Sequence, residues 1–227
     1  ATLLHDDVID KAEIRRGKPS VNAKWSDDIA ILMADYLFSA GFDLALNHLD
    51  PAPLKVICQV TRRMCEGEMF QIDQQDRWLT PDDYIYIISC KTAYLFSACA
   101  SLGGLLAQQE ADQVDHLSSY GLAFGRAFQI TDDTLDYTAN DGRWGKPVGI
   151  DLASGKQTLP LILTLNDATQ DERKLLETLL NDGRDFQQVM QTIQAHEAID
   201  RSIQIARDHA SEAVDQLSQL HPVNHAV

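Results

Sequence analysis

The sequence has few basic residues, and this limits the partners that its surface can attract. It carries 19 Lys and Arg against 34 Asp and Glu in 227 residues, which gives a formal net charge of -15. A protein gains affinity for nucleic acid through excess cationic charge, so we expect no nucleic-acid partner. A local basic cluster could still hold a small anion.

Long apolar runs and targeting signals are also missing. No stretch approaches the roughly 18 uninterrupted apolar residues that a membrane-spanning helix needs, so we expect no transmembrane segment. A secretory signal, with a basic start followed by an apolar centre, is not visible. We therefore expect a cytoplasmic protein.

Cysteine, glycine and proline are sparse, with 4, 12 and 7 residues respectively. The cysteines form no C-x-x-C pair and have no histidine at metal-ligand spacing, which argues against zinc. Small buried thiols in a reducing compartment are the expected state of these four residues: Cys58, Cys65, Cys90 and Cys99.

Helix signals dominate the rest of the chain, 44% of which is apolar. Thr80 and Pro81, followed by two acids, predict a helix start, and Thr169 with Glu172 fits a capping box. These signals predict an all-α fold, with one domain over residues 1–227 and two basic, glycine-containing loops at 15–25 and 140–156. A 3.6-residue period after residue 113 predicts one core-facing stripe: Val114, Leu117, Gly121, Phe124, Phe128 and Leu135.

The first residues are apolar and contain neither Met nor a helix cap. They resemble the interior of a helix, so we expect further residues upstream of Ala1.

Two acidic triads share the pattern D-D-x-x-D. On a helix, residues i and i+4 stack one turn apart with i+1 beside them, so three carboxylates can point at one small volume. A divalent cation would offset their repulsion, and oxygen ligands suit Mg2+. In a chain this rich in Asp, one such pattern can arise by chance, but two are much less expected. The candidate metal ligands are Asp6, Asp7 and Asp10, and Asp132, Asp133 and Asp136.

Basic residues follow each triad at short distance. Arg15 and Arg16 come after the first, and Lys146 and Lys156 come after the second. Mg2+ usually completes its coordination shell with substrate phosphates, and Arg and Lys bind phosphate oxygens. A solvated basic pair is the alternative for Arg15 and Arg16, but their position beside an acidic triad favours a diphosphate site.

With these motifs in order, the sequence resembles the trans-type polyprenyl diphosphate synthases. The resemblance runs from residue 1 to about 165 and becomes diffuse beyond it. It rests on six stretches: 3–10 (LLHDDVID), 15–19 (RRGKP), 67–71 (GEMFQ), 91–92 (KT), 128–136 (FQITDDTLD) and 145–152 (GKPVGIDL) followed by Gly155-Lys156.

The resemblance implies an isoprenoid synthase-type helical bundle around a central cavity, with Mg2+ as cofactor and a homodimer as the assembly. The substrates would be isopentenyl diphosphate and an allylic diphosphate, and the six triad aspartates would be catalytic and metal-binding. Arg15 would meet the allylic diphosphate and Arg16 the isopentenyl diphosphate. The other implied substrate-binding residues are Lys91, Thr92, Gln129, Lys146 and Lys156.

The resemblance also raises a question about substrate binding and one about product length. The family's remaining isopentenyl diphosphate contacts lie upstream of the first motif, where this chain has none. In relatives, a bulky residue five positions before the first motif Asp tends to close the product tunnel. That position is the small Ala1 here, which implies a medium-to-long product.

Three other classes of function remain open from the sequence. A terpene cyclase of the same fold usually has a single aspartate-rich motif of this kind. A non-catalytic subunit of a heteromeric synthase tends to lose these motifs, whereas both are complete here. A helical metal-binding module would need neither the arginine pair nor the two lysines.

Overall fold

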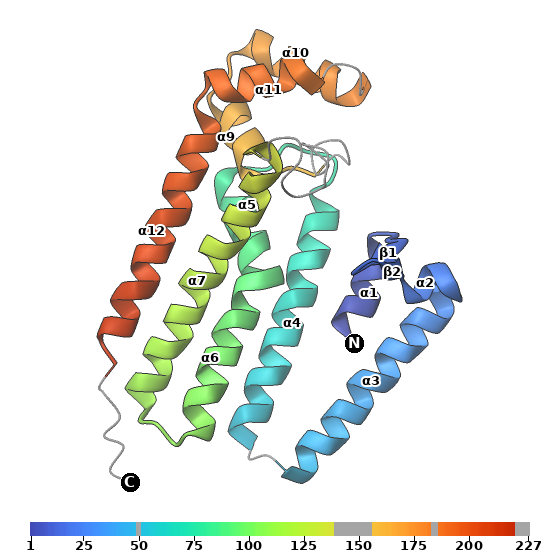
Figure 1. Ribbon diagram of the computed structural model, residues 1–227, viewed down its shortest axis with the longest axis vertical. Coiled ribbons are helices and arrows are strands. Elements are labelled where there is room, and N and C mark those ends of the chain that lie inside the picture. The colour runs from blue at the N-terminus through green and yellow to red at the C-terminus, as the bar shows by residue number, and fades with distance from the viewer. Residues whose placement is uncertain (49–50, 139–155, 183–185, 221–227) are drawn as a thin grey trace. The chain divides into compact units, whose positions relative to one another are not determined.

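The computed structural model describes residues 1–48, 51–138, 156–182 and 186–220, and their regular secondary structure is helical apart from one small hairpin (Figure 1). The predicted all-α fold is confirmed. The chain forms two compact units, Ala1–Lys55 and Val56–Val227. The prediction of a single domain over 1–227 therefore stays a prediction.

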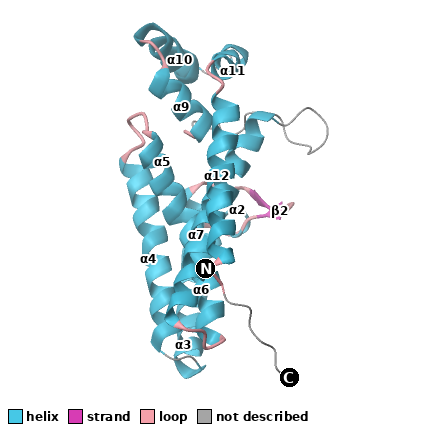
Figure 2. Cartoon of the chain, turned by 90° about the vertical axis from the view of Figure 1, so that its left-hand side faces the viewer, coloured by secondary structure: helices cyan, strands magenta, loops and turns pink. Residues whose placement is uncertain are grey.

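The first unit contains short elements followed by one long helix. Helix α1 (Thr2–Ile9) carries the first triad, and strands β1 (Ile14–Arg15) and β2 (Lys18–Pro19) form an antiparallel pair (Figure 2). Helices α2 (Val21–Lys24) and α3 (Asp27–His48) follow.

The stretch 15–25 was expected to be a loop, and this is wrong in part. Arg16 and Gly17 both have positive φ, 51° and 74°, which suits a two-residue hairpin turn. Arg15 therefore lies on a strand, and Arg16 lies at the turn.

The second unit is built around the long helix α7 (Ala111–Thr138), which packs between α6 (Tyr94–Leu106) and α12 (Ala198–Ser218) (Figure 1). Helix α4 (Pro51–Asp73) begins in the last residues of the first unit and continues into the second, and α5 (Pro81–Ile88) continues into the π-helix η1 (Ser89–Ala93). Three shorter helices complete the unit: α9 (Leu159–Asp167), α10 (Gln170–Asp182) and α11 (Phe186–Ala195).

Both predicted helix starts are confirmed. The Thr80 hydroxyl accepts from the Asp83 backbone N–H while Asp83 accepts from the Thr80 N–H, which makes a capping box at α5. Thr169 and Glu172 form the same pair of hydrogen bonds at α10. These reciprocal bonds satisfy backbone donors that a helix start leaves without partners.

The core of the second unit gathers around α9. Every residue from Leu159 to Leu165 is buried, as expected for a helix that is apolar on all sides. Ile130 and Tyr137 of α7 join the same cluster, together with Leu176 of α10 and Ile193 of α11. This core fixes one end of α7, where the second triad lies.

One prediction about burial is wrong in part and another is wrong. Helix α7 does form, and Gly121 of the expected stripe is buried, but Phe124, Phe128 and Leu135 are exposed, Phe128 to 49%, whereas Ala123 and Gly125 are buried. Gly121 and Gly125 allow the preceding helical segment to approach α7 closely. Of the four cysteines only Cys90 is buried, and the other three are exposed.

Two helical stretches among the described residues, Asp27–Asn47 and Pro81–Leu106, are long and apolar enough to cross a membrane. This is a statement about length and composition only, because the core helix of a globular protein meets the same criterion. The absence of a transmembrane segment therefore stays a prediction.

Candidate active site

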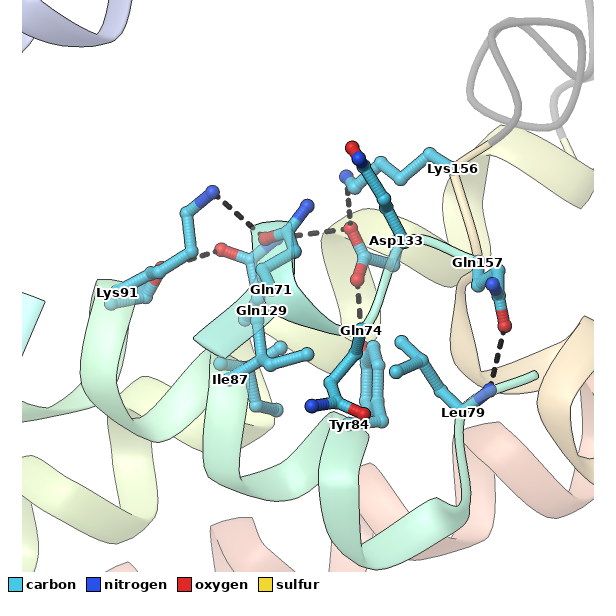
Figure 3. A pocket seen from close by; sticks show the side chains of 13 residues that line it. Gln71, Gln74, Leu79, Tyr84, Ile87, Lys91, Gln129, Asp133, Lys156 and Gln157 are labelled. Atoms are coloured by element: carbon cyan, nitrogen blue, oxygen red, sulfur yellow. Dashed lines mark hydrogen bonds and ion pairs between the residues drawn. The ribbon is translucent and has the colours of Figure 1, made fainter. Parts of the chain in front are cut away.

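The middle aspartate of the second triad is the centre of a hydrogen-bond network in the second unit. Asp133 is only 1% exposed. Its Oδ2 accepts from the Tyr84 hydroxyl at 2.7 Å, and its Oδ1 accepts from Lys156 Nζ and from Gln129 Nε2, both at 3.0 Å (Figure 3). A buried carboxylate needs such partners, because its charge is costly to remove from water without them.

The elements that supply these partners explain why they meet. Gln129 lies one turn before Asp133 on α7, so the two side chains share a helix face. Tyr84 stands in the first turn of α5, which the Thr80 capping box fixes. Burial, with the Asp133 charge beside it, raises the pKa of Tyr84 far above its usual 10.0, so the hydroxyl keeps its proton and donates.

Lys91 and Thr92 lie on the π-helix η1. The Lys91 ammonium pairs with Glu68 at 2.6 Å and donates to Gln71 Oε1 at 3.0 Å, while the Thr92 hydroxyl donates to Gln129 Oε1 at 2.8 Å. A single π turn inside an α-helix is often found at functional sites, and here it carries two of the predicted substrate-binding residues.

These side chains line one cavity of about 220 Å³ (Figure 3). Lys91, Thr92, Gln129, Asp133 and Lys156 supply its polar wall. Apolar side chains of α5, together with Leu79, line the other side. The cavity therefore carries two cations, each paired with a carboxylate, and neutral hydrogen-bonding groups.

The first triad repeats the arrangement of the second within its own unit. Asp7 is 2% exposed and accepts from Arg15 Nε at 2.6 Å. Asn22 Nδ2 donates to the backbone oxygens of Asp7 and Ala12, at 3.2 and 3.1 Å, which ties α2 to the end of α1. Arg15 is thus oriented by a buried carboxylate.

The outer aspartates of both triads are more accessible than the middle ones. Asp10 and Asp132 are exposed, and Asp6 and Asp136 are half-buried. In the described residues no three His, Cys, Asp or Glu side chains are gathered as a metal site would require. The expectation that all three carboxylates of a triad point into one volume does not match this structure, because each middle residue turns inward.

The structure locates most of the predicted substrate-binding residues. Lys91, Thr92, Gln129 and Lys156 are brought together, Arg15 is held by Asp7, and Arg16 is exposed at the hairpin turn. Lys146 lies outside the described residues. Sequence reasoning assigned no role to Tyr84, Glu68 or Gln71, although the last two belong to the stretch 67–71 that carried the resemblance.

Comparison with known proteins shows the family of the chain. The polyprenyl synthetase family model matches residues 1–199. The chain is 33% identical over 224 residues to octaprenyl diphosphate synthase of Escherichia coli (strain K12), covering 97% of this chain and 69% of that protein. It is 34% identical over 231 residues to geranylgeranyl diphosphate synthase of Saccharolobus solfataricus, with coverage of 96% and 69%. It is 35% identical over 227 residues to heptaprenyl diphosphate synthase component 2 of Geobacillus stearothermophilus, with coverage of 100% and 71%.

Solved structures give the same result. A decaprenyl diphosphate synthase from Rhodobacter capsulatus matches with a TM-score of 0.90 and 33% identity, covering 97% of this chain and 70% of that one. A polyprenyl synthase from Caulobacter crescentus CB15, complexed with calcium and isoprenyl diphosphate, matches with a TM-score of 0.85 and 32% identity, covering 97% and 69%.

The fold and these relatives thus show an all-α prenyltransferase. The chain belongs to the polyprenyl synthetase family, as the motifs predicted. Its homologues are prenyl diphosphate synthases, enzymes that condense isopentenyl diphosphate with an allylic diphosphate.

Proposed function

We propose that this protein is a Mg2+-dependent trans-polyprenyl diphosphate synthase whose allylic diphosphate binds at the cavity of the second unit. The observation that carries the assignment is the set of diphosphate-binding groups around Asp133. Lys91 and Lys156 provide positive charge there, and Thr92 and Gln129 provide neutral hydrogen-bonding groups.

Magnesium fits the donors that the chain offers. The outer aspartates Asp6, Asp10, Asp132 and Asp136 present hard carboxylate oxygens that solvent can reach at least in part. The Caulobacter crescentus relative was crystallised as a complex with calcium, which supports a divalent cation in that protein. When bound, Mg2+ would neutralise charge on the diphosphate, and the residues named here would hold it.

The side chains around the cavity act on the leaving group. As the allylic C–O bond breaks, its electron pair leaves with the diphosphate, and Lys91 and Lys156 stabilise the growing negative charge. The double bond of isopentenyl diphosphate then attacks the allylic cation to form a new C–C bond. The proton lost from the adduct passes to the departed diphosphate, so no nucleophilic Ser or Cys is required.

An aromatic row on α7 continues from Asp132 and supplies an apolar wall. Phe128, Phe124 and Tyr120 follow at four-residue intervals, and Phe96 of α6 packs against the first two with ring centroids 5.5 and 5.3 Å apart. We propose that this wall shields the cation from water and contacts the growing chain.

The first triad completes the proposed site. Arg15 would contact the allylic diphosphate and Arg16 the isopentenyl diphosphate, with Lys146 adding a further cation. We propose that each triad binds Mg2+ and diphosphate oxygens, as the order of motifs in the family suggests. The small Ala1 supports a medium-to-long product.

Assembly and location are proposed on the same basis. Helix α3 exposes a run of large apolar residues, among them Ile29, Leu32 and Tyr36, which suits a homodimer interface. The acidic balance supports the absence of a nucleic-acid partner, and the cytoplasm is the proposed location.

The test is incubation of the full-length protein with isopentenyl diphosphate, an allylic primer and Mg2+, followed by chromatography of the products. We expect the products to be trans-polyprenyl diphosphates longer than C15. We expect Asp6→Ala and Asp132→Ala each to keep the fold and to lower turnover by orders of magnitude. Farnesyl diphosphate as sole product would contradict the proposed length.

The same incubation separates the other functional classes. A terpene cyclase would consume the allylic diphosphate without isopentenyl diphosphate. A non-catalytic subunit or a metal-binding module would show no turnover alone, and either result would overturn the proposal.

A further inference from the structure

Asp133 uses both carboxylate oxygens inside the protein. Three donors reach it from three parts of the chain: Tyr84 of α5, Gln129 of α7 and Lys156, which precedes α9. The adjacent Asp132 is exposed. A metal ion that bound Asp133 would have to reach a carboxylate that is only 1% exposed and whose charge three partners already offset, and removal of one partner from such a group is strongly unfavourable.

Helix geometry explains why the middle residue of the triad differs from its neighbours. Successive residues are about 100° apart around a helix, whereas i and i+4 differ by only about 40°. Asp132 and Asp136 therefore project from nearly the same side. Asp133 is turned toward α5, where Tyr84 covers its Oδ2.

The contacts of Asp133 orient two groups of the cavity. The lysine side chain is a flexible stem with a mobile charge, and the Asp133 carboxylate holds the Lys156 ammonium at the cavity wall. Because Gln129 donates its Nε2 to Asp133, its Oε1 is fixed toward the Thr92 hydroxyl. One carboxylate thus sets the position of Lys156 and the amide orientation of Gln129.

The first triad repeats this design independently. Asp7 is also the middle residue, is also buried, and also holds a cation, Arg15, at 2.6 Å. Its neighbours Asp6 and Asp10 are more accessible. Two separate helices therefore place the second aspartate of D-D-x-x-D against a basic side chain of the proposed diphosphate site.

We infer that Tyr84 and Asp133 form a buried anchor that positions Lys156 and Gln129 on the diphosphate, and that Asp133 acts through these residues and not as a metal ligand. The inference rests on the proposed function, because it takes diphosphate as the ligand. Asp7 has the corresponding role for Arg15. Tyr84 and Asp133 are positioning residues, and the outer aspartates remain the proposed metal ligands.

The experiment uses full-length protein and titrates Mg2+ and inorganic diphosphate by calorimetry. Asp132→Asn is the matched comparison for Asp133→Asn, since both remove one charge from adjacent residues. We expect Asp132→Asn to weaken Mg2+ binding in the presence of diphosphate. Asp133→Asn should keep the number of bound Mg2+ ions. Its affinity for diphosphate should fall roughly tenfold, as loss of a charge-assisted hydrogen bond predicts.

Tyr84→Phe keeps the ring and removes only the hydroxyl, so it tests the anchor if Asp133→Asn does not fold. We expect Tyr84→Phe to lower the affinity for diphosphate a few-fold at temperatures well below the melting point of the variant. In the Lys156→Gln background the effect of Tyr84→Phe should largely disappear, because residues that act through one another are not additive. A purely structural tyrosine would lower the melting temperature and leave diphosphate affinity unchanged, which would overturn the inference.

Two further outcomes would contradict either the role of Asp133 or the proposed function. If Asp133→Asn loses Mg2+ to the same extent as Asp132→Asn, then Asp133 is a metal ligand and the inference is wrong. If the wild-type protein binds neither Mg2+ nor diphosphate, the proposed function itself fails, which is a different result.

Discussion

Gly67 shows how a single missing β-carbon shapes the site. A β-carbon at this position would collide with the Cys90 side chain, so the glycine allows α4 to lie against η1. The same approach places Glu68 beside Lys91 at 2.6 Å. The glycine is therefore needed for close packing next to a substrate-binding residue.

Replacement of Gly67 tests this packing. We expect Gly67→Ala to lower the free energy of unfolding by about 1–3 kcal/mol, because the added methyl overpacks a close contact. Gly103→Ala is the matched control, since a β-carbon there meets nothing within 4 Å and a helical alanine is favoured by up to about 1 kcal/mol. Urea unfolding of both variants gives the measurement. Equal stability of the two would contradict the packing argument.

Single residues also show how far the sequence could predict the site. The two triads, the arginine pair and Lys156 were identified from motifs and spacing, whereas Lys91, Thr92 and Gln129 were implied only by the resemblance to the family. The inward turn of Asp7 and Asp133 was not predicted, because a helical pattern gives relative directions but not which direction meets a neighbouring element. Tyr84 was missed for the same reason, since it reaches Asp133 from 49 residues away.

Among the elements, α7 illustrates a correct prediction of a helix whose buried face was predicted only in part. Its apolar period places Gly121 and the large side chains Phe124 and Phe128 on one inner stripe. The close packing uses Gly121 of that stripe against α6 and Gly125, outside the stripe, against η1, since a β-carbon there would lie 2.5 Å from the Phe96 carbonyl oxygen or the Ala93 α-carbon. Small residues permit the close approach of two helices, and hydrophobicity alone does not reveal that.

The junction of α9 and α12 has a contact that depends on pH. Arg201 Nη1 pairs with Asp167 Oδ2 at 2.6 Å. The hydrogen bond from Arg201, assisted by one from Asn166, lowers the pKa of Asp167 below its usual 3.8. Because the folded pKa is depressed, this carboxylate stabilises the fold above about pH 4, and the contribution is lost as pH falls through the folded value.

We therefore expect Asp167→Asn to lower the melting temperature slightly at neutral pH and to flatten its decline in acid. Both partners are about 40% exposed, so the effect should stay below about 1 kcal/mol and shrink in high salt. Asp215→Asn, at an exposed position of α12, is the control. Melting curves between about pH 3 and 7 provide the measurement, and parallel curves for wild type and Asp167→Asn would contradict the assignment.

At the scale of the whole molecule, helix α3 exposes an apolar surface that a partner could bury. This helix buries Ala30 and Ala34 and leaves most of its large apolar side chains exposed. A patch of this kind marks an interaction surface, and a second copy of the chain is the proposed partner. The same helix meets the length and composition of a membrane span, and experiment can separate these two interpretations.

We expect wild-type protein to have twice the mass of one chain by light scattering. The double variant Leu32→Glu and Tyr36→Glu should shift it to the monomer, because buried charges without partners are unfavourable. Asn47→Glu adds one charge at an exposed polar position of α3 and should leave the dimer intact. Flotation of the wild-type protein with lipid vesicles, in place of dimerisation, would contradict the proposed interface.

The sequence by itself determined the helices, their caps and the acidic and basic motifs, because these depend on residues within a few turns of one another. It also determined the family, since the ordered motifs identify it without coordinates. Only the tertiary structure decided which aspartates are buried and which face solvent, which face of α7 packs inward, and that Tyr84 meets Asp133. The burial of a residue depends on which side chains of a neighbouring element pack against its helix face. Those side chains come from residues that are distant in the sequence.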